Sequence, residues 1–202
     1  FVGHLMFSKG IDVALRAFEK ICDEHDFVLH IYGSMINSEY HDWIKKLQEQ
    51  YPDKFIYHGL FHADDISKIA SKIDVCIIPS YFDTYNRVVR EILYLGVPVI
   101  VTDFFGAYII ENGKNGFRIP VGDADALTER MTAIICNPSI LEDLSRGVKK
   151  TYIPSLEEEI DEMLKTYNNL YHALPESRKA LLTEMMIPNE NRESLVGKNT
   201  KL

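Results

Sequence analysis

The chain has 202 residues, enough for one domain and a tail, and its 46% hydrophobic and 26% charged residues are ordinary for a soluble globular protein. Its net charge of −8, without a basic stripe, argues against nucleic acid as the main partner and gives no support for binding an anionic membrane surface. The longest apolar runs are far shorter than the roughly 20 residues of a membrane span, so we expect no transmembrane segment.

The chain starts with Phe1-Val2 directly before Gly3, which is typical of the end of a strand, and we expect no signal peptide. We therefore expect a fragment of a longer protein, with a truncated first strand and the missing part upstream. The three cysteines, Cys22, Cys76 and Cys136, are widely spaced and odd in number. We therefore expect buried thiols in a reducing compartment, and neither disulfides nor a metal site.

Strand and helix patterns alternate from Val2 to Ile119. The strand patterns after Val2 are residues 27–32, 54–58, 75–78, 97–101 and 117–119. The helix patterns between them are residues 10–22, about 38–51, 62–71 and about 84–95, the last closed by Gly96. This alternation predicts an α/β fold with a Rossmann-like, doubly wound parallel sheet of about six strands.

Only helices are expected after Ile119. Asp123 begins a helix to about residue 136, and Pro138 begins another to about residue 150. Ser155 and Glu158 form a capping box for a helix to about residue 171. These patterns give a sheet domain over residues 1–152, C-terminal helices over 153–186, including one from 175 to 186, and a polar tail over 187–202.

The stretch from Asp74 to Gly116 contains the first candidate site residues. Its two apolar runs do not alternate, which is typical of strands buried on both faces. Asp83 lies in the loop after the first run, and Glu91 lies in the helix that follows. Ligands of open α/β sheets bind beyond the carboxyl ends of the strands, so we expect both carboxylates at a ligand.

Two interpretations of these carboxylates stay open on spacing alone. If the helix starts near Thr84, then Asp83 or Thr84 caps it, and Arg87 forms a surface pair with Glu91 one turn on. Alternatively, the carboxylates accept hydrogen bonds from ligand hydroxyls, since one carboxylate can bind both hydroxyls of a vicinal diol such as a ribose.

Two further loops are candidates for binding an anion. Lys9 lies just before a helix start, where a lysine and free backbone N–H groups suit a phosphate, although most lone lysines are solvated. His4 precedes it, and a protonated His4 would donate to a phosphate oxygen. Gly106, in the loop after residue 101, would let backbone amides approach an anion, but it is weak evidence alone.

The order and spacing of these pieces resemble the C-terminal domain of GT-B fold, retaining glycosyltransferases of family 4, or group 1. The resemblance covers about residues 1–150 and rests on FVGHLMFSKGIDVALRAF, LHIYG, FIYHGLF, IDVCIIPSYFDTYNRVVREILYLGVPVIVTD and ENGKNGFRIPVGD. It implies that this chain is the donor-binding half of a GT-B fold and that the acceptor-binding N-terminal domain is the missing part.

The resemblance implies a role for each matching residue. Asp83 and Glu91 match the E-x7-E motif, so Asp83 would contact the transferred sugar near the reacting centre and Glu91 would hold the ribose. Lys9 would contact the donor diphosphate, and Phe61 would lie at the base. The remaining donor-binding residues would be the loop after Asp83 and the glycines and histidine at strand ends: Tyr85, Asn86, Arg87, Gly3, His4 and Gly33.

Several positions depart from the family pattern. His4 replaces a usual arginine, Asp83 a commoner glutamate and Asn86 a usual glycine, although asparagine tolerates positive φ better than most residues. Phe104-Phe105 stand where the family has a Gly-Gly pair, and Tyr108 stands where a glutamate is frequent. These departures indicate a changed sugar preference.

The resemblance therefore implies transfer of a sugar from a nucleotide-diphosphate donor, with UDP as the first choice, to a glycan or lipid-linked acceptor. It implies no metal and no other cofactor, and a cytoplasmic location in which any attachment to the inner face of the membrane is made by the missing half. In this family the C-terminal helix commonly crosses to the N-terminal domain. The alternatives are a binding-only module that has lost transfer and a nucleotide-sugar 2-epimerase.

Overall fold

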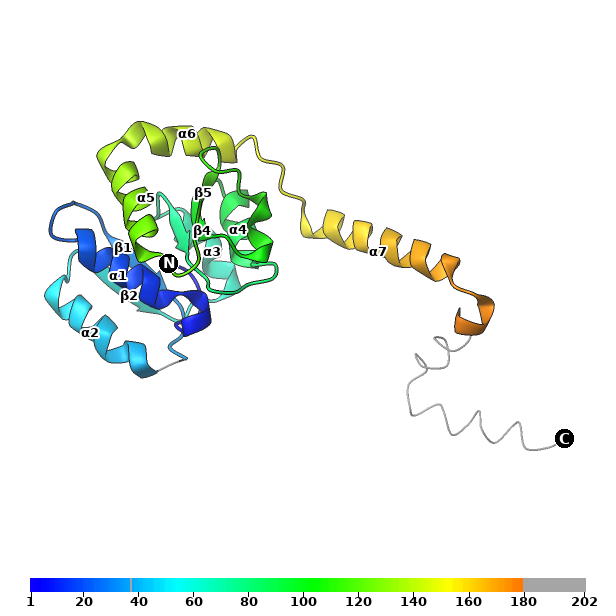
Figure 1. Ribbon diagram of the computed structural model, residues 1–202, viewed down its shortest axis with the longest axis horizontal. Coiled ribbons are helices and arrows are strands. Elements are labelled where there is room, and N and C mark those ends of the chain that lie inside the picture. Colours follow the sequence, from blue (N-terminus) through cyan, green and yellow to red (C-terminus); the bar gives the residue numbers. More distant parts are fainter. Residues whose placement is uncertain (37, 180–202) are drawn as a thin grey trace. The chain divides into compact units, whose positions relative to one another are not determined.

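The computed structural model describes residues 1–36 and 38–179 (Figure 1). The chain divides into two compact units, Phe1–Ile153 and a second that begins at Pro154. All strands of the described residues lie in the first unit, which therefore holds the predicted sheet domain.

The strands form two parallel sheets. The first sheet pairs β1 (Leu29–Tyr32) with β2 (Phe55–Gly59), and the second has the order β3 (Cys76–Ile78), β4 (Val99–Thr102) and β5 (Gly116–Ile119). Five strands are thus found in the described residues, where about six were expected. The expected strand at Val2 is a single bridge to Tyr32, because only two residues precede the turn at Gly3.

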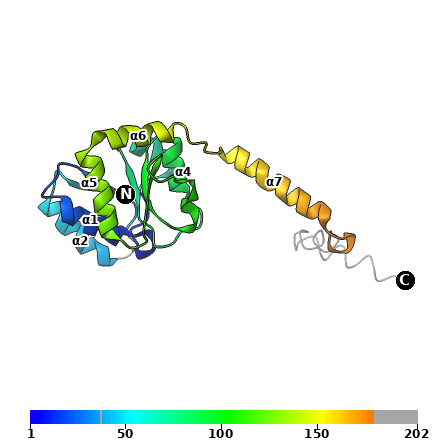
Figure 2. The same cartoon turned by 45° about the horizontal axis from the view of Figure 1, so that its top comes forward.

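Helices cover both faces of the strands. The α-helices of the first unit are α1 (Ile11–Ile21), α2 (His41–Gln50), α3 (Ile66–Ala70), α4 (Arg87–Tyr94), α5 (Ala124–Cys136) and α6 (Pro138–Val148). Short 3-10 helices are η1 (Phe7–Lys9), η2 (Ser38–Tyr40), η3 (Ala63–Asp65) and η4 (Phe105–Ile109). Figure 2 shows α1 and α5 on one side of the strands and α4 on the other, which is the doubly wound arrangement.

Successive residues of one strand pack into different cores. In β3, Ile77 joins a core with α1, α2 and α5, whereas Cys76 and Ile78 join a core with α3 and α4. In β4, Ile100 lies in the first core, and Val99 and Val101 lie in the second. This two-sided burial explains why both runs are apolar at every position.

Helix α4 begins later than the sequence indicates. Its first residue is Arg87 and its N-cap is Asn86, so Asp83 and Thr84 belong to the preceding loop and the expectation of a start near Thr84 is wrong. Asn86 has φ 45° and accepts a hydrogen bond from the Val89 amide through its side chain at 3.2 Å. At the other end, Gly96 follows the helix with φ 88°, which confirms it as the terminating glycine.

The C-terminal helices follow the predicted caps. Asp123 caps α5 through the Ala126 amide, and the capping box of Ser155 and Glu158 begins α7 (Leu156–Ala173) in the second unit. Residues 176–179 are helical, while the rest of the helix expected to residue 186 and the tail expected over 187–202 lie outside the described residues. No helix of the described residues is long and apolar enough to cross a membrane.

The cysteines match the expectation only in part. Cys22 and Cys76 are buried, but Cys136 is exposed, so its expected burial is wrong. Cys136 is the last residue of α5, and the helix ends there on a solvent-facing position.

Candidate functional site

One pocket of about 550 Å³ lies beyond the carboxyl ends of β1, β2 and β3. All ten residues proposed from the sequence line it: Gly3, His4, Lys9, Gly33, Phe61, Asp83, Tyr85, Asn86, Arg87 and Glu91. The fold therefore brings together residues from four separate places in the sequence, namely the segments that follow Val2, β1, β2 and β3. Their binding roles remain predictions, and their proximity is an observation.

The loop that carries Lys9 is fixed against the segment after β3. Gly10 has φ 68°, and a Cβ on it would lie 1.8 Å from the carbonyl oxygen of Pro79, so only glycine fits here. The Tyr81 amide donates to the Ser8 carbonyl at 3.0 Å, and the rings of Phe7 and Tyr81 stack at 4.3 Å. These contacts place Lys9 at the pocket.

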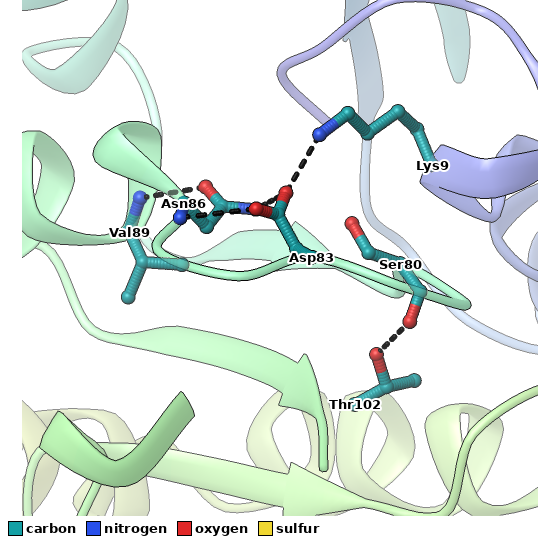
Figure 3. Close-up of polar contacts among 6 residues, drawn as sticks. All are labelled: Lys9, Ser80, Asp83, Asn86, Val89 and Thr102. Atoms are coloured by element: carbon teal, nitrogen blue, oxygen red, sulfur yellow. Dashed lines mark hydrogen bonds and ion pairs between the residues drawn. The ribbon is translucent and has the colours of Figure 1, made fainter. Parts of the chain in front are cut away.

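Lys9 and Asp83 form an ion pair, with 2.6 Å between Lys9 Nζ and Asp83 Oδ2 (Figure 3). The Asp83 carboxylate also accepts from the Asn86 amide at 3.1 Å and from Asn86 Nδ2 at 3.0 Å. Burial raises the pKa of Asp83, but these hydrogen bonds, a further backbone bond from Tyr85 and the charge of Lys9 outweigh it, so the pKa lies below its ordinary value. Asp83 is therefore ionised at neutral pH.

The N-terminus of α4 directs backbone donors to the same region. An α-helix leaves its first amides without acceptors inside the helix. The Asn86 amide donates to Asp83 and the Val89 amide to Asn86, which leaves the amides of Arg87 and Val88 as this end's candidate donors for an anion. Positive φ at Asn86 confirms that asparagine serves where a glycine would otherwise be needed.

Glu91 lies one turn further along α4. Its carboxylate is 4.0 Å from Arg87 Nε, at the limit of an ion pair, and the side chains are 39% and 77% exposed. This is the surface pair that spacing indicated, and it is weak at such exposure. Glu91 also lines the pocket, and its binding of ligand hydroxyls stays a prediction.

The strand ends at Gly3 and Gly33 form a second close backbone contact. A Cβ on Gly33 would lie 1.8 Å from the Gly3 carbonyl oxygen. His4 Nδ1 lies 2.7 Å from Ser34 Oγ, which orients the imidazole at the pocket edge. Phe61 follows β2, is half-buried and lines the pocket.

The loop after β4 has a packing role. Gly106 is buried and does not line the pocket, and a Cβ on it would lie 2.8 Å from the Thr84 carbonyl oxygen. Arg90 of α4 lies over the rings of Tyr85 at 4.4 Å and Tyr108 at 5.6 Å, and it donates to the Tyr108 hydroxyl at 2.7 Å. We call these three residues the arginine clamp, and it ties the loop after β4 to the loop that contains Tyr85.

Sequence reasoning missed two serines of the pocket, Ser34 and Ser80. Each directly follows a strand-ending residue, Gly33 or Pro79, and that position was the available signal. In the described residues no three His, Cys, Asp or Glu side chains gather as metal ligands do. For an anionic ligand group, the pocket offers one ammonium, backbone amides and side-chain hydroxyls. For the hydroxyl groups of a ligand, it offers two carboxylates.

The fold and pocket define an α/β domain with a pocket at the carboxyl ends of parallel strands. The model of the family "Glycosyl transferases group 1" matches residues 1–137, so the chain belongs to this family. An uncharacterised glycosyltransferase of Methanocaldococcus jannaschii is 28% identical over 153 residues, which are 74% of this chain and 38% of that protein.

Many solved structures share the fold, and two of them illustrate the likeness. Sucrose-phosphate synthase from Thermosynechococcus elongatus has a TM-score of 0.72 and 22% identity, covering 86% of this chain and 46% of that one. Anabaena HepE, solved in complex with UDP and glucose, has a TM-score of 0.64 and 20% identity, covering 82% and 48%. These likenesses confirm the expected half of a GT-B fold. The chain spans less than half the length of these relatives.

Proposed function

We propose that this chain is the nucleotide-sugar-binding half of a retaining glycosyltransferase, which transfers a sugar to a glycan or a lipid-linked acceptor. The observation that carries the proposal is that Lys9, Asp83 and Glu91 line the same pocket, at the carboxyl ends of three strands. The family membership supports the same reaction class.

Each charged group has a distinct task in this proposal. Lys9 and the first amides of α4 hold the diphosphate and carry the negative charge that develops on the leaving group, without a metal ion. Asp83, ionised beside Lys9, accepts hydrogen bonds from the transferred sugar. Glu91 accepts both hydroxyls of the ribose, and Phe61 contacts the base.

The chain supplies one side of the reaction. Since it spans less than half of its relatives, we propose that an upstream domain supplies the acceptor site. We expect this chain to bind donor weakly and to transfer no sugar alone, so robust turnover by it would contradict the proposal. We propose a cytoplasmic location for the whole protein, and UDP as the nucleotide, because HepE was solved with UDP.

Calorimetric titration of the chain with UDP, GDP and ADP tests the proposal. We expect binding of one nucleotide, weakened about tenfold or more in Lys9→Ala and Glu91→Ala, since a hydrogen bond to a charged group contributes about 1.5–3 kcal/mol. Lys45→Ala is the matched control, because Lys45 is an exposed lysine in a helix outside the pocket.

The possible results separate the candidate functions. Binding that survives both pocket substitutions would contradict the assignment of the site. Donor binding without transfer by the full-length protein would indicate a binding-only module, and release of a free sugar isomer would indicate an epimerase. Binding of none of the three nucleotides would contradict the donor site in this chain.

A further inference from the structure

Ser80 has a hydroxyl that the fold itself does not use. The residue is fully buried, and its Oγ has no hydrogen-bond partner among the described residues. The carbonyl oxygen of Ser80 is satisfied independently, since it accepts a hydrogen bond from Thr102 Oγ1. Figure 3 shows the hydroxyl on the side of Lys9 and Asp83, and the carbonyl oxygen on the side of Thr102.

This arrangement costs stability. A buried hydroxyl without a partner lowers stability, and an alanine at this position would avoid that cost. The neighbouring backbone does not require a serine, because the Pro79 and Tyr81 contacts with the Lys9 loop involve other atoms. A polar group that the protein leaves unsatisfied beside a ligand pocket is suited to a ligand atom.

We propose that Ser80 Oγ donates a hydrogen bond to a phosphate oxygen of the nucleotide diphosphate, beside the Lys9 ammonium. This inference rests on the proposed donor site, and it adds a binding residue to it. A phosphate oxygen is favoured over a sugar hydroxyl because Lys9 supplies positive charge on the same side as the Ser80 hydroxyl. The Lys9 side chain is 32% exposed, so it can move to admit the oxygen without unpacking a core.

Ser80→Ala tests the proposal through two measurements on the 202-residue chain. Calorimetry is expected to show UDP binding weakened about tenfold, which is the typical effect of losing one hydrogen bond to a charged group. Thermal unfolding is expected to show an unchanged or raised midpoint, because the substitution removes an unsatisfied buried group. Ser80→Cys, close in size but a weak donor, should lose part of the affinity.

Two control variants make these results interpretable. Thr102→Val removes a buried hydroxyl that has a partner, so it should lower the unfolding midpoint by about 2–4 °C. Ser71→Ala removes an exposed hydroxyl that donates to the carbonyl oxygen of Lys68, outside the pocket. This variant should leave UDP affinity unchanged.

Three results would overturn the inference. Wild-type affinity for UDP in Ser80→Ala would show that the hydroxyl does not contact the nucleotide, while the donor site itself would stand. Unchanged UDP affinity with weakened UDP-sugar affinity would place the hydroxyl at the sugar. Failure of the wild-type chain to bind UDP, GDP and ADP would overturn the donor site together with this inference.

Discussion

Asp83 shows how a single residue of the pocket is fixed by its surroundings. Its side chain is 12% exposed and accepts hydrogen bonds from Lys9 Nζ and from two nitrogens of Asn86. Burial alone would raise its pKa, but the partners prevail and the folded-state pKa lies below the ordinary value of 3.8. A lowered pKa contributes stability above the unfolded pKa, and that contribution is lost as the pH falls through the folded value.

Asp83→Asn is therefore expected to destabilise the chain in a pH-dependent manner. At pH 7 the free energy of unfolding should fall by about 1 kcal/mol, because the partly exposed Lys9 loses its charged acceptor. At about pH 2, well below the ordinary pKa of an aspartate, the stability difference between wild type and variant should be smaller, because protonation of the wild-type carboxyl removes its charge. Urea denaturation at both pH values measures the difference.

Glu49→Gln is the matched control for this prediction. Glu49 pairs with Lys45 at 3.9 Å, and both side chains are more than 60% exposed, so the substitution should change stability little at either pH. A stability difference between wild type and Asp83→Asn that is the same at both pH values would show that the ion pair is not its source.

At the scale of elements, the arginine clamp connects α4 to the loop after β4. Arg90 is the central residue, and its contacts with Tyr85 and Tyr108 accompany the close approach of Gly106 to the backbone at Thr84. Arg90 does not line the pocket, but it holds the ring of Tyr85, which does, so Arg90 is a positioning residue.

Arg90→Met is expected to loosen the loop over residues 83–86. Hydrogen exchange of the amides in this loop should be faster by about tenfold. Each cation–π contact contributes about 0.5–1 kcal/mol, and the variant loses two such contacts and one hydrogen bond. Exchange measured by mass spectrometry on peptides that cover this loop tests the prediction. Arg146→Met is the control, because Arg146 pairs with Asp143 within α6 alone. Equal exchange rates in wild type and Arg90→Met would contradict the role.

Elements with local signals were predictable from the sequence. The Asp123 cap of α5, the Ser155–Glu158 box of α7 and the terminating Gly96 depend on neighbouring residues only, and each is confirmed. The start of α4 was not predictable, because Asp83, Thr84 and Asn86 all suit a helix cap. The choice depends on distant contacts, namely Lys9 with Asp83 and Gly106 with the Thr84 backbone.

The candidate site was predictable for a different reason. From the residues alone, Lys9 was a candidate at one junction and Asp83 and Glu91 at another, and the parallel topology implied that these junctions meet at one edge of the sheet. The third candidate junction, at Gly106, does not line the pocket. Ser80 was not predictable, because a serine after a strand is common and the absence of a partner for its hydroxyl is visible only in three dimensions.

At the scale of the whole molecule, the two compact units differ in how they bury apolar residues. The first unit has two cores of buried apolar residues. Helix α7 has no buried residue, and a stripe of large apolar side chains at helical spacing is 45% or more exposed: Leu156, Ile160, Met163, Leu164, Tyr167 and Leu170. Such a stripe is typical of a helix that covers another protein surface.

A chain that ends at Ile153 should therefore keep the stability and the ligand affinity of the first unit. We expect its free energy of unfolding to change by less than about 0.5 kcal/mol, as for changes away from a core. UDP affinity should stay within about twofold, because every residue of the pocket precedes Ile153. A chain that ends at Asn137 is the control, since it loses the buried Leu144 and Val148 of α6 and should be destabilised by several kcal/mol. Thermal unfolding and calorimetry of the two truncated chains test this prediction. A loss of UDP binding on removal of residues 154–202 would contradict it and would show that the second unit contributes to the donor site.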